Sequence, residues 1–161
     1  MKFNINSIFA PMQLSVIIVN YNVKKLLREC LLSVQKAAIN IDTEIWVVDN
    51  ASSDGSVEML KSEFENVNLI ANSKNVGFST ANNQAIKKAL GEYILILNPD
   101  TLVYENTFSE CLKFNLTTAK CGGIGVQMLD VNANFLKESK RGFPDPWASL
   151  FRLSFLNRFF P

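Results

Sequence analysis

The sequence predicts an α/β protein built on a mostly parallel β-sheet with helices on both faces. Four short apolar segments, rich in β-branched residues, alternate with segments whose apolar residues recur at helical spacing. Polar residues directly follow three of the apolar segments, at 20–22, 49–53 and 98–100. Such alternation favours right-handed parallel crossovers, which bring the carboxyl ends of the strands to one edge of the sheet.

The elements can be placed in order. The apolar segments predict strands at residues 14–19, 43–49, 67–71 and 92–97. Helical spacing predicts helices at about 23–34, 56–64, 78–90 and 104–118. Ser53 or Asp54 is expected to cap the second helix, and Gly91 to end the third helix in a left-handed conformation. The fourth strand, from Glu92 to Leu97, is expected to be buried and to end at a Pro-containing turn.

The part of the chain beyond the fourth helix gives weaker patterns. Residues 122–128 look like a strand, 130–134 like a hairpin tip, and 135–140 like its returning arm. We therefore divide the chain into an N-terminal extension at 1–13, an incomplete binding domain at 14–140, and an amphipathic segment at 141–161. The last segment could lie on a membrane surface, or it could pack against a missing part of the protein.

The composition excludes several classes of function. A net charge of +1 without a long basic run argues against nucleic-acid binding. The absence of histidine excludes Ser-His and Cys-His nucleophiles and histidine-ligated zinc within this sequence. The three cysteines show no metal-type spacing and fit a reducing compartment. Because no stretch approaches the ~20 apolar residues that span a bilayer and residues 1–13 make a poor signal peptide, we expect a cytoplasmic protein.

The polar strand ends could converge on a nucleotide. Tyr21, Asp49 and Asp100 are far apart in the sequence, but parallel strands would bring them to the same edge. A carboxylate at that edge can hold a divalent cation against a phosphate. Taken alone, Asn98-Pro99-Asp100 is more typical of an ordinary turn, so the interpretation depends on the joint pattern.

The joint pattern resembles the family-2 glycosyltransferases of the GT-A fold, which is Rossmann-like. The resemblance covers the chain from Leu14 onward and rests on VIIVNYN at 16–22, VVDNASSDGS at 47–56, Asn72 with NVGF at 75–78, and LNPDT at 97–101. Within the family, the Asn-Pro-Asp form, the NVGF loop and RGFP at 141–144 look most like the rhamnosyltransferase-type branch that builds bacterial surface polysaccharides.

The resemblance implies how a nucleotide would be held. Tyr21 would stack on the pyrimidine ring. Asp49 would accept a hydrogen bond from the ring N–H that uracil and thymine share. The remaining residues that it implies at the donor site near these strand ends are Asn20, Asn22, Asn50 and Ser52.

The resemblance also implies a metal ion. Asp100 would bind Mg²⁺ or Mn²⁺ that bridges the diphosphate. Asn98 stands where many relatives have a further Asp, so the ion would be held mostly by Asp100 and the phosphates. Asn75 and Gly77, at a loop entering a helix, could approach the sugar or the diphosphate, or could simply cap the helix.

The activity implied is that of an inverting glycosyltransferase. It would transfer a sugar, with rhamnose as a candidate, from a UDP- or dTDP-sugar to a polysaccharide or lipid-linked saccharide acceptor. Such enzymes use an acidic general base downstream of the metal site, and Asp130, Glu138 and Asp145 do not match its motif. We therefore expect the base beyond Pro161, the acceptor half to be missing, and little transfer by this chain alone. The alternative is a non-catalytic nucleotide-sugar-binding remnant or a scaffold subunit.

Two other enzyme classes are disfavoured. A sugar-phosphate nucleotidyltransferase would carry a glycine-rich loop after its first strand, where residues 20–22 contain no glycine. A dinucleotide dehydrogenase needs Gly-x-Gly-x-x-Gly, and residues 122–125 lack that spacing. Exposed apolar surface is expected to promote self-association, and contact with the inner face of the membrane is expected if the C-terminal segment binds lipid.

Overall fold

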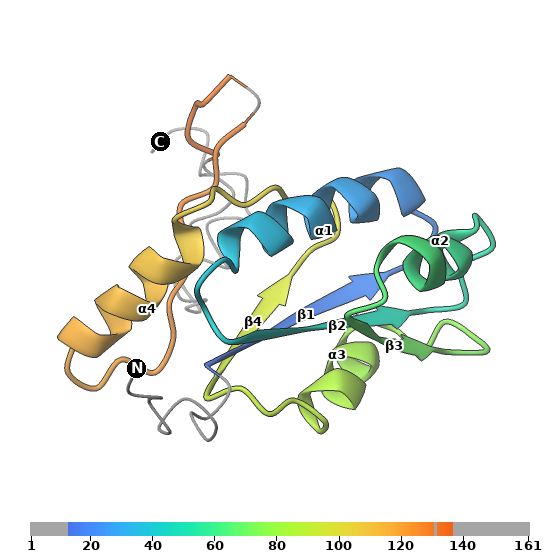
Figure 1. The fold of residues 1–161 in the computed structure, drawn as a ribbon, viewed down its shortest axis with the longest axis horizontal. Helices are drawn as coiled ribbons and strands as arrows, with labels where there is room; N and C mark the ends of the chain where they lie inside the picture. Colours follow the sequence, from blue (N-terminus) through green and yellow to red (C-terminus); the bar gives the residue numbers. More distant parts are fainter. Residues whose placement is uncertain (1–12, 131, 137–161) are drawn as a thin grey trace, which may run out of the picture. The chain divides into compact units, whose positions relative to one another are not determined.

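The structure is a computed structural model that describes residues 13–130 and 132–136 of the 161-residue chain. The chain forms two compact units, residues 1–119 and 120–161, which we describe separately. The first unit contains a four-stranded sheet in the order β3-β2-β1-β4 with helices on both faces (Figure 1). The predicted fold class is therefore confirmed.

All neighbouring strands in the sheet are parallel. The strands are β1 (Leu14–Asn20), β2 (Thr43–Asp49), β3 (Val67–Ala71) and β4 (Tyr93–Leu97). β1 lies inside the sheet and is buried at every position, because helices cover both of its faces. Asn20 is opposite Asp49 in the register, so the polar residues that end β1 and β2 lie side by side at the carboxyl ends of the strands.

Four helices flank this sheet: α1 (Lys24–Ala37), α2 (Ser56–Glu63), α3 (Phe78–Ile86) and α4 (Thr107–Thr117). α1 and α2 cover one face and α3 covers the other (Figure 1). The larger core joins one face of the sheet to α1, α2 and α4, and its fully buried members include Val16, Ile18, Leu27, Leu31, Val34 and Val47. The smaller core joins the opposite face to α3 and consists of Ile17, Val19, Val48, Ala81 and Ala85.

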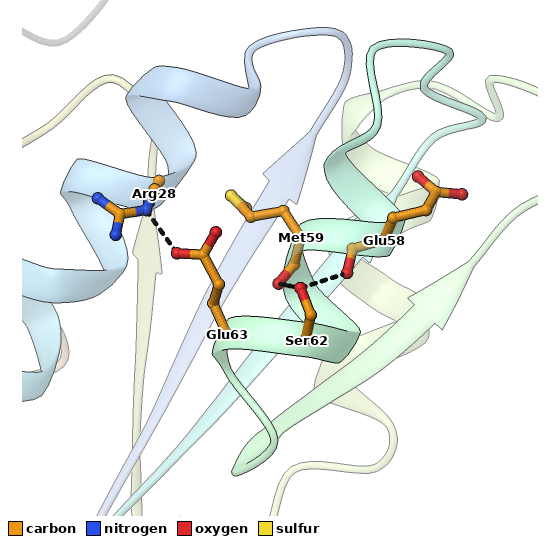
Figure 2. A network of polar contacts seen from close by, with 5 residues as sticks. All are labelled: Arg28, Glu58, Met59, Ser62 and Glu63. Carbon is orange, nitrogen blue, oxygen red and sulfur yellow. Dashed lines mark hydrogen bonds and ion pairs between the residues drawn. The ribbon is translucent and has the colours of Figure 1, made fainter.

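An ion pair joins α1 to α2 next to hydrogen bonds within α2 (Figure 2). Arg28 Nε and Glu63 Oε2 are 2.6 Å apart. Within α2, Ser62 Oγ donates to the backbone oxygens of Glu58 and Met59. Because both charged side chains are about half exposed, the ion pair contributes at most ~1 kcal/mol. The buried Met59 and Leu60 fix α2 on the sheet more strongly.

The prediction that the fourth strand is buried was wrong for one face. Ile94 and Ile96 are 44% and 50% exposed. They lie on the α3 side of the sheet, where Ile96 is opposite the buried Ile17. The cause is that α3 packs against β1 and β2 and leaves this face of β4 exposed.

The prediction that Gly91 caps the third helix was also wrong. α3 ends at Ile86, and Lys87 follows it in a right-handed conformation. Gly91 instead lies against β1: a Cβ at this position would be 2.5 Å from the Ser15 backbone nitrogen. Ala89 and the exposed Leu90 therefore lie outside the helix rather than on its inner face.

A cluster near the amino ends of β1 and β2 holds the segment between α3 and β4 in place. The Glu44 carboxylate accepts hydrogen bonds from Ser15 Oγ, Trp46 Nε1 and the Leu90 N–H at 2.6, 2.8 and 2.6 Å. Gly91 N–H in turn donates to Ser15 Oγ. This group of residues, which we call the Glu44 latch, joins β1, β2 and the segment before β4.

The later predictions had mixed outcomes. α4 confirms the predicted helix in a shorter form, with Phe108 buried but Leu116 81% exposed. Residues 122–128 do not form a strand. The hairpin tip is confirmed, because Asp130 and Asn134 are joined by a backbone hydrogen bond and Leu129 pairs antiparallel with Phe135. The amphipathic segment at 141–161, the extension at 1–12 and the arm from 137 to 140 lie outside the described residues. Among the helices that the structure describes, none is long and apolar enough to cross a membrane.

Candidate functional site

The candidate site begins with a buried pair at the carboxyl ends of β1 and β2. Asn20 Nδ2 donates to Asp49 Oδ1 at 2.7 Å, and the Ser52 N–H donates to Asp49 Oδ2 at 2.9 Å. Both side chains are almost fully buried, and each Asp49 oxygen already has a protein donor. In this arrangement Asp49 ties the two strand ends together. Its predicted contact with a base N–H stays a prediction and would use a further lone pair of the carboxylate.

The two loops that leave β1 and β2 are joined above this pair. Ser52 Oγ accepts hydrogen bonds from Asn20 Nδ2 and from the Asn22 N–H at 3.1 and 2.9 Å. Asn22 Oδ1 accepts from the Ser53 N–H at 2.8 Å. Asn22 has a φ of 55°, which an asparagine tolerates better than most residues. Asn20, Asn22 and Ser52 therefore form one hydrogen-bonded support, and their contact with a donor stays a prediction.

Asp54 caps two helices, and it does so from the position before the N-cap residue of α2. The N-cap position of α2 is Gly55, and Asp54 Oδ1 accepts from the Ser56 N–H at 3.0 Å. Asp54 Oδ2 accepts from the N–H of Lys24, the first residue of α1, which has no side-chain cap of its own. Partial burial raises the pKa of Asp54, but hydrogen bonds from Ser56 and Lys24 outweigh it and leave the pKa lowered. The negative charge at two helix N-termini stabilises both. Ser53 makes no such cap.

Tyr21 stands free beside this support. It is 50% exposed at the end of β1, directly after the buried Asn20. An exposed phenol ring beside fixed polar groups offers a flat surface on which a base can stack.

A chain of three side-chain amides lies on the other side of Asp49. Asn72 Nδ2 donates to Asn50 Oδ1 at 2.9 Å and to Gln84 Oε1 at 2.9 Å. Gln84 Nε2 donates back to Asn72 Oδ1 at 3.1 Å. The Asn72 N–H also donates to the Asp49 backbone oxygen. The ends of β2 and β3 and the side of α3 are thereby connected through Asn50, Asn72 and Gln84, which we call the amide relay.

The Asn75–Gly77 loop leads from β3 into α3. Asn75 Oδ1 accepts from the Gly77 N–H at 2.9 Å, and Gly77 has a φ of 82°. No side chain caps α3, so the N–H groups of its first turn keep their capacity for an anion. Both residues are exposed, which suits either the donor contact or the plain capping role predicted for them.

The end of β4 carries Asn98 and Asp100, both exposed. The Thr101 N–H donates to the Asn98 backbone oxygen at 3.2 Å, which makes this segment a turn. Cys30 of α1 lies beneath it, with Sγ 3.7 Å from the same oxygen. Burial raises the pKa of Cys30 to about 12, and the Asp100 carboxylate adds to the rise, so the thiol stays protonated and can donate.

The donor set at β4 suits a metal ion only together with a ligand. The described residues contain no group of three or more Cys, Asp or Glu side chains that could hold a metal ion. Asp100 with the Asn98 amide provides one carboxylate and one neutral oxygen. Mg²⁺ and Mn²⁺ accept such a sparse protein set when phosphate oxygens complete the coordination. The residues present therefore fit an ion that binds with a diphosphate.

A separate depression lies away from the strand ends. It has a volume of about 800 Å³ between α1 and residues 102–106 and is lined by Glu29, Leu32, Ser33, Lys36, Leu102, Val103, Tyr104, Glu105 and Asn106. None of the predicted site residues lines it.

Three participants were missed or undervalued by sequence reasoning. Asn72 belongs to the family resemblance but was not assigned to the site, and Gln84 and Cys30 look like ordinary helix residues in the sequence. The sequence offered one sign of the role of Gln84, which is its place in α3 directly before the buried Ala85.

Comparison with known protein families agrees with the parallel sheet described above. The family model "Glycosyl transferase family 2" matches residues 15–156. This chain belongs to that family. A family-2 fold agrees with the parallel sheet, with its helices on both faces, and with polar residues at the carboxyl ends of the strands.

Several glycosyltransferases are similar to this chain. A poly(ribitol-phosphate) beta-glucosyltransferase of Bacillus spizizenii is 36% identical over 124 residues, which cover 70% of this chain and 20% of that protein. The structure of S. aureus TarS 1–349 in complex with UDP aligns with a TM-score of 0.58 and 28% identity, covering 64% of this chain and 32% of TarS 1–349. The mannosyltransferase PcManGT from Pyrobaculum calidifontis, in complex with GDP-Man and Mn²⁺, aligns with a TM-score of 0.61 and 27% identity over 71% of this chain and 34% of its own. The chain thus spans about a fifth to a third of the length of these proteins.

Proposed function

We propose that this chain binds a nucleotide sugar and serves an inverting glycosyltransferase reaction that builds a bacterial cell-surface polysaccharide. The observation that carries the proposal is that Tyr21, Asn50 and Asp100 follow the carboxyl ends of three neighbouring parallel strands in a family-2 fold. The solved relatives that bind UDP, or GDP-Man with Mn²⁺, support a nucleotide-sugar donor and a divalent ion. A UDP- or dTDP-sugar is the donor that we propose, with rhamnose and glucose as candidate sugars. A lipid-linked saccharide or a polysaccharide, including a poly(ribitol phosphate), is the acceptor that we propose.

Each residue has a stated part in this proposal. Tyr21 stacks on the base, and Asp49 and Asn50 face its edge. Asn20, Asn22 and Ser52 keep the two loops in place below the nucleotide. Asn75 and Gly77 lie toward the sugar and diphosphate, where the free N–H groups of α3 favour negative charge.

The ion would be held by Asp100 with the Asn98 amide. When bound, Mg²⁺ or Mn²⁺ neutralises the charge that develops on the departing diphosphate. The Cys30 thiol supports the Asn98 backbone oxygen and so keeps the loop that carries Asp100 in place.

Binding of UDP and dTDP tests the proposal, measured by isothermal titration calorimetry with and without Mn²⁺. We expect binding that tightens with Mn²⁺, and we expect Asp100→Ala to remove the Mn²⁺-dependent part, because the protein's carboxylate ligand is lost. Glu105→Ala, which changes an exposed acid on the following loop, is the matched control and should behave as the wild type. Absence of nucleotide binding in the wild type would contradict the proposal.

A transfer assay tests whether the general base lies within this chain. We expect the 161-residue chain to bind its donor and to transfer poorly, since Asp130, Glu138 and Asp145 do not match the motif of the family's general base. Asp130 illustrates the point: hydrogen bonds from Asn134 and Asn132 lower its pKa, which makes it a weaker base. Transfer at a rate usual for the family would show that the base lies within this chain.

A further inference from the structure

The amide relay determines which atom of the Asn50 side chain, the donor nitrogen or the acceptor oxygen, is left to bind a ligand. An amide side chain carries an acceptor oxygen and a donor nitrogen on adjacent positions, and either can be turned toward a ligand. Asn50 is buried, and its Oδ1 is taken by Asn72 Nδ2. Within the described residues, no protein acceptor is hydrogen-bonded to Asn50 Nδ2. The relay therefore leaves a donor, rather than an acceptor, for a ligand.

Gln84 on α3 sets the orientation of the Asn50 amide through Asn72. Gln84 and Asn72 form a reciprocal amide pair, in which each donates to the other's oxygen. The second N–H of Asn72 then points to Asn50 Oδ1. Three linked amides have two self-consistent arrangements, because reversing one reverses its neighbours. The structure adopts the arrangement in which Asn50 offers Nδ2.

We propose that Gln84 is a positioning residue for nucleobase selection: through Asn72 it turns Asn50 so that Nδ2 donates to the O4 carbonyl of uracil or thymine. Cytosine carries an amino donor in place of O4, so two donors would face each other and the Asn50 N–H would lose its partner. The amide relay thereby favours UDP- and dTDP-sugars over CDP-sugars. This inference rests on the proposed nucleotide-sugar function.

Asn72→Asp provides a direct test. A carboxylate cannot donate, so it can only accept from Gln84 Nε2 and from Asn50 Nδ2, and Asn50 must reverse and offer Oδ1. We expect the ratio of CDP to UDP dissociation constants, measured by titration calorimetry with saturating Mn²⁺, to fall by about tenfold, the effect of one hydrogen bond exchanged for a mismatch.

Two further variants make the measurement decisive. Gln84→Leu removes the reciprocal pair without adding charge, so both relay arrangements become populated and the ratio should fall by about threefold. Asn68→Asp makes the same chemical change as Asn72→Asp at an exposed position of β3, and we expect it to leave the ratio unchanged. If Asn72→Asp does not fold by circular dichroism, the Gln84→Leu ratio decides alone.

The outcomes separate the two proposals. A wild-type chain that binds neither UDP nor dTDP overturns the nucleotide-sugar function itself. A chain that binds UDP, but whose CDP-to-UDP ratio stays within twofold of the wild type in the folded relay variants, keeps that function and overturns the relay. Equal weakening of both nucleotides would likewise assign the relay a purely structural role.

Discussion

Glycine shows most clearly how single residues of this fold serve different purposes. Gly91 has an ordinary backbone conformation but lies so close to β1 that a Cβ would be 2.5 Å from the Ser15 nitrogen and 2.8 Å from the Leu14 carbonyl carbon. Gly77 is the reverse case: its φ is 82°, and nothing lies within 4 Å of a Cβ built there. The first glycine is required for space, and the second for backbone conformation.

The same substitution should therefore destabilise both positions, for different reasons. Gly91→Ala should lower the free energy of unfolding by about 2 to 3 kcal/mol, because backbone atoms of β1 must move. Gly77→Ala should lower it by about 1 to 3 kcal/mol, because a φ of 82° with a ψ of 162° is a conformation that essentially only glycine adopts. Urea denaturation of both variants measures these losses. A loss below ~0.5 kcal/mol for Gly91→Ala would contradict the close approach to β1.

At the scale of elements, the Glu44 latch explains how β4 is held beside β1. Its carboxylate accepts from Ser15 on β1, from Trp46 on β2 and from the Leu90 N–H before β4. Partial burial raises the pKa of Glu44, but the hydrogen bonds from Leu90, Ser15 and Trp46 outweigh it, so the pKa is lower than its usual value of 4.5. The charged form is therefore the one that the fold stabilises.

The latch makes a prediction about pH. A carboxyl group whose pKa is lowered by folding stabilises the protein above its unfolded pKa, and this contribution is lost as the pH falls through the folded value. Glu44→Gln should therefore cost ~1 kcal/mol at pH 7, discounted for its solvent exposure. The gap between variant and wild type should shrink below about pH 4. Thermal unfolding between pH 3 and pH 7 measures this gap, and a gap independent of pH would exclude the charge as the cause.

The elements themselves were largely predictable, because apolar runs and helical spacing are local signals. The bounds of β2 and β3 were predicted as observed, and α2 differed by one residue. What failed depends on tertiary contacts: the exposure of Ile94 and Ile96 follows from where α3 packs, and the place of Gly91 from its distance to β1. The amide relay was missed for the same reason, since Gln84 reaches Asn50 only through Asn72 after β2, β3 and α3 have assembled.

At the scale of the whole molecule, apolar surface on β4 remains to be explained. Ile94 and Ile96 lie half exposed on the α3 side of the sheet, and among the described residues β4 pairs only with β1. An uncovered apolar strand at a sheet edge is a surface on which another chain can pair or pack. This is the physical basis for expecting self-association.

We expect the chain to self-associate as its concentration rises, giving a mass above 18.1 kDa in size-exclusion chromatography with light scattering. Ile96→Lys should shift it toward the monomer, because a charge on this face opposes the burial of β4 against a second copy. Leu90→Lys is the matched control: Leu90 is 74% exposed but precedes β4 and is not part of the strand, so this substitution should have little effect. A monomer at every concentration would exclude self-association, and an equal response to both substitutions would place the contact somewhere other than the β4 face.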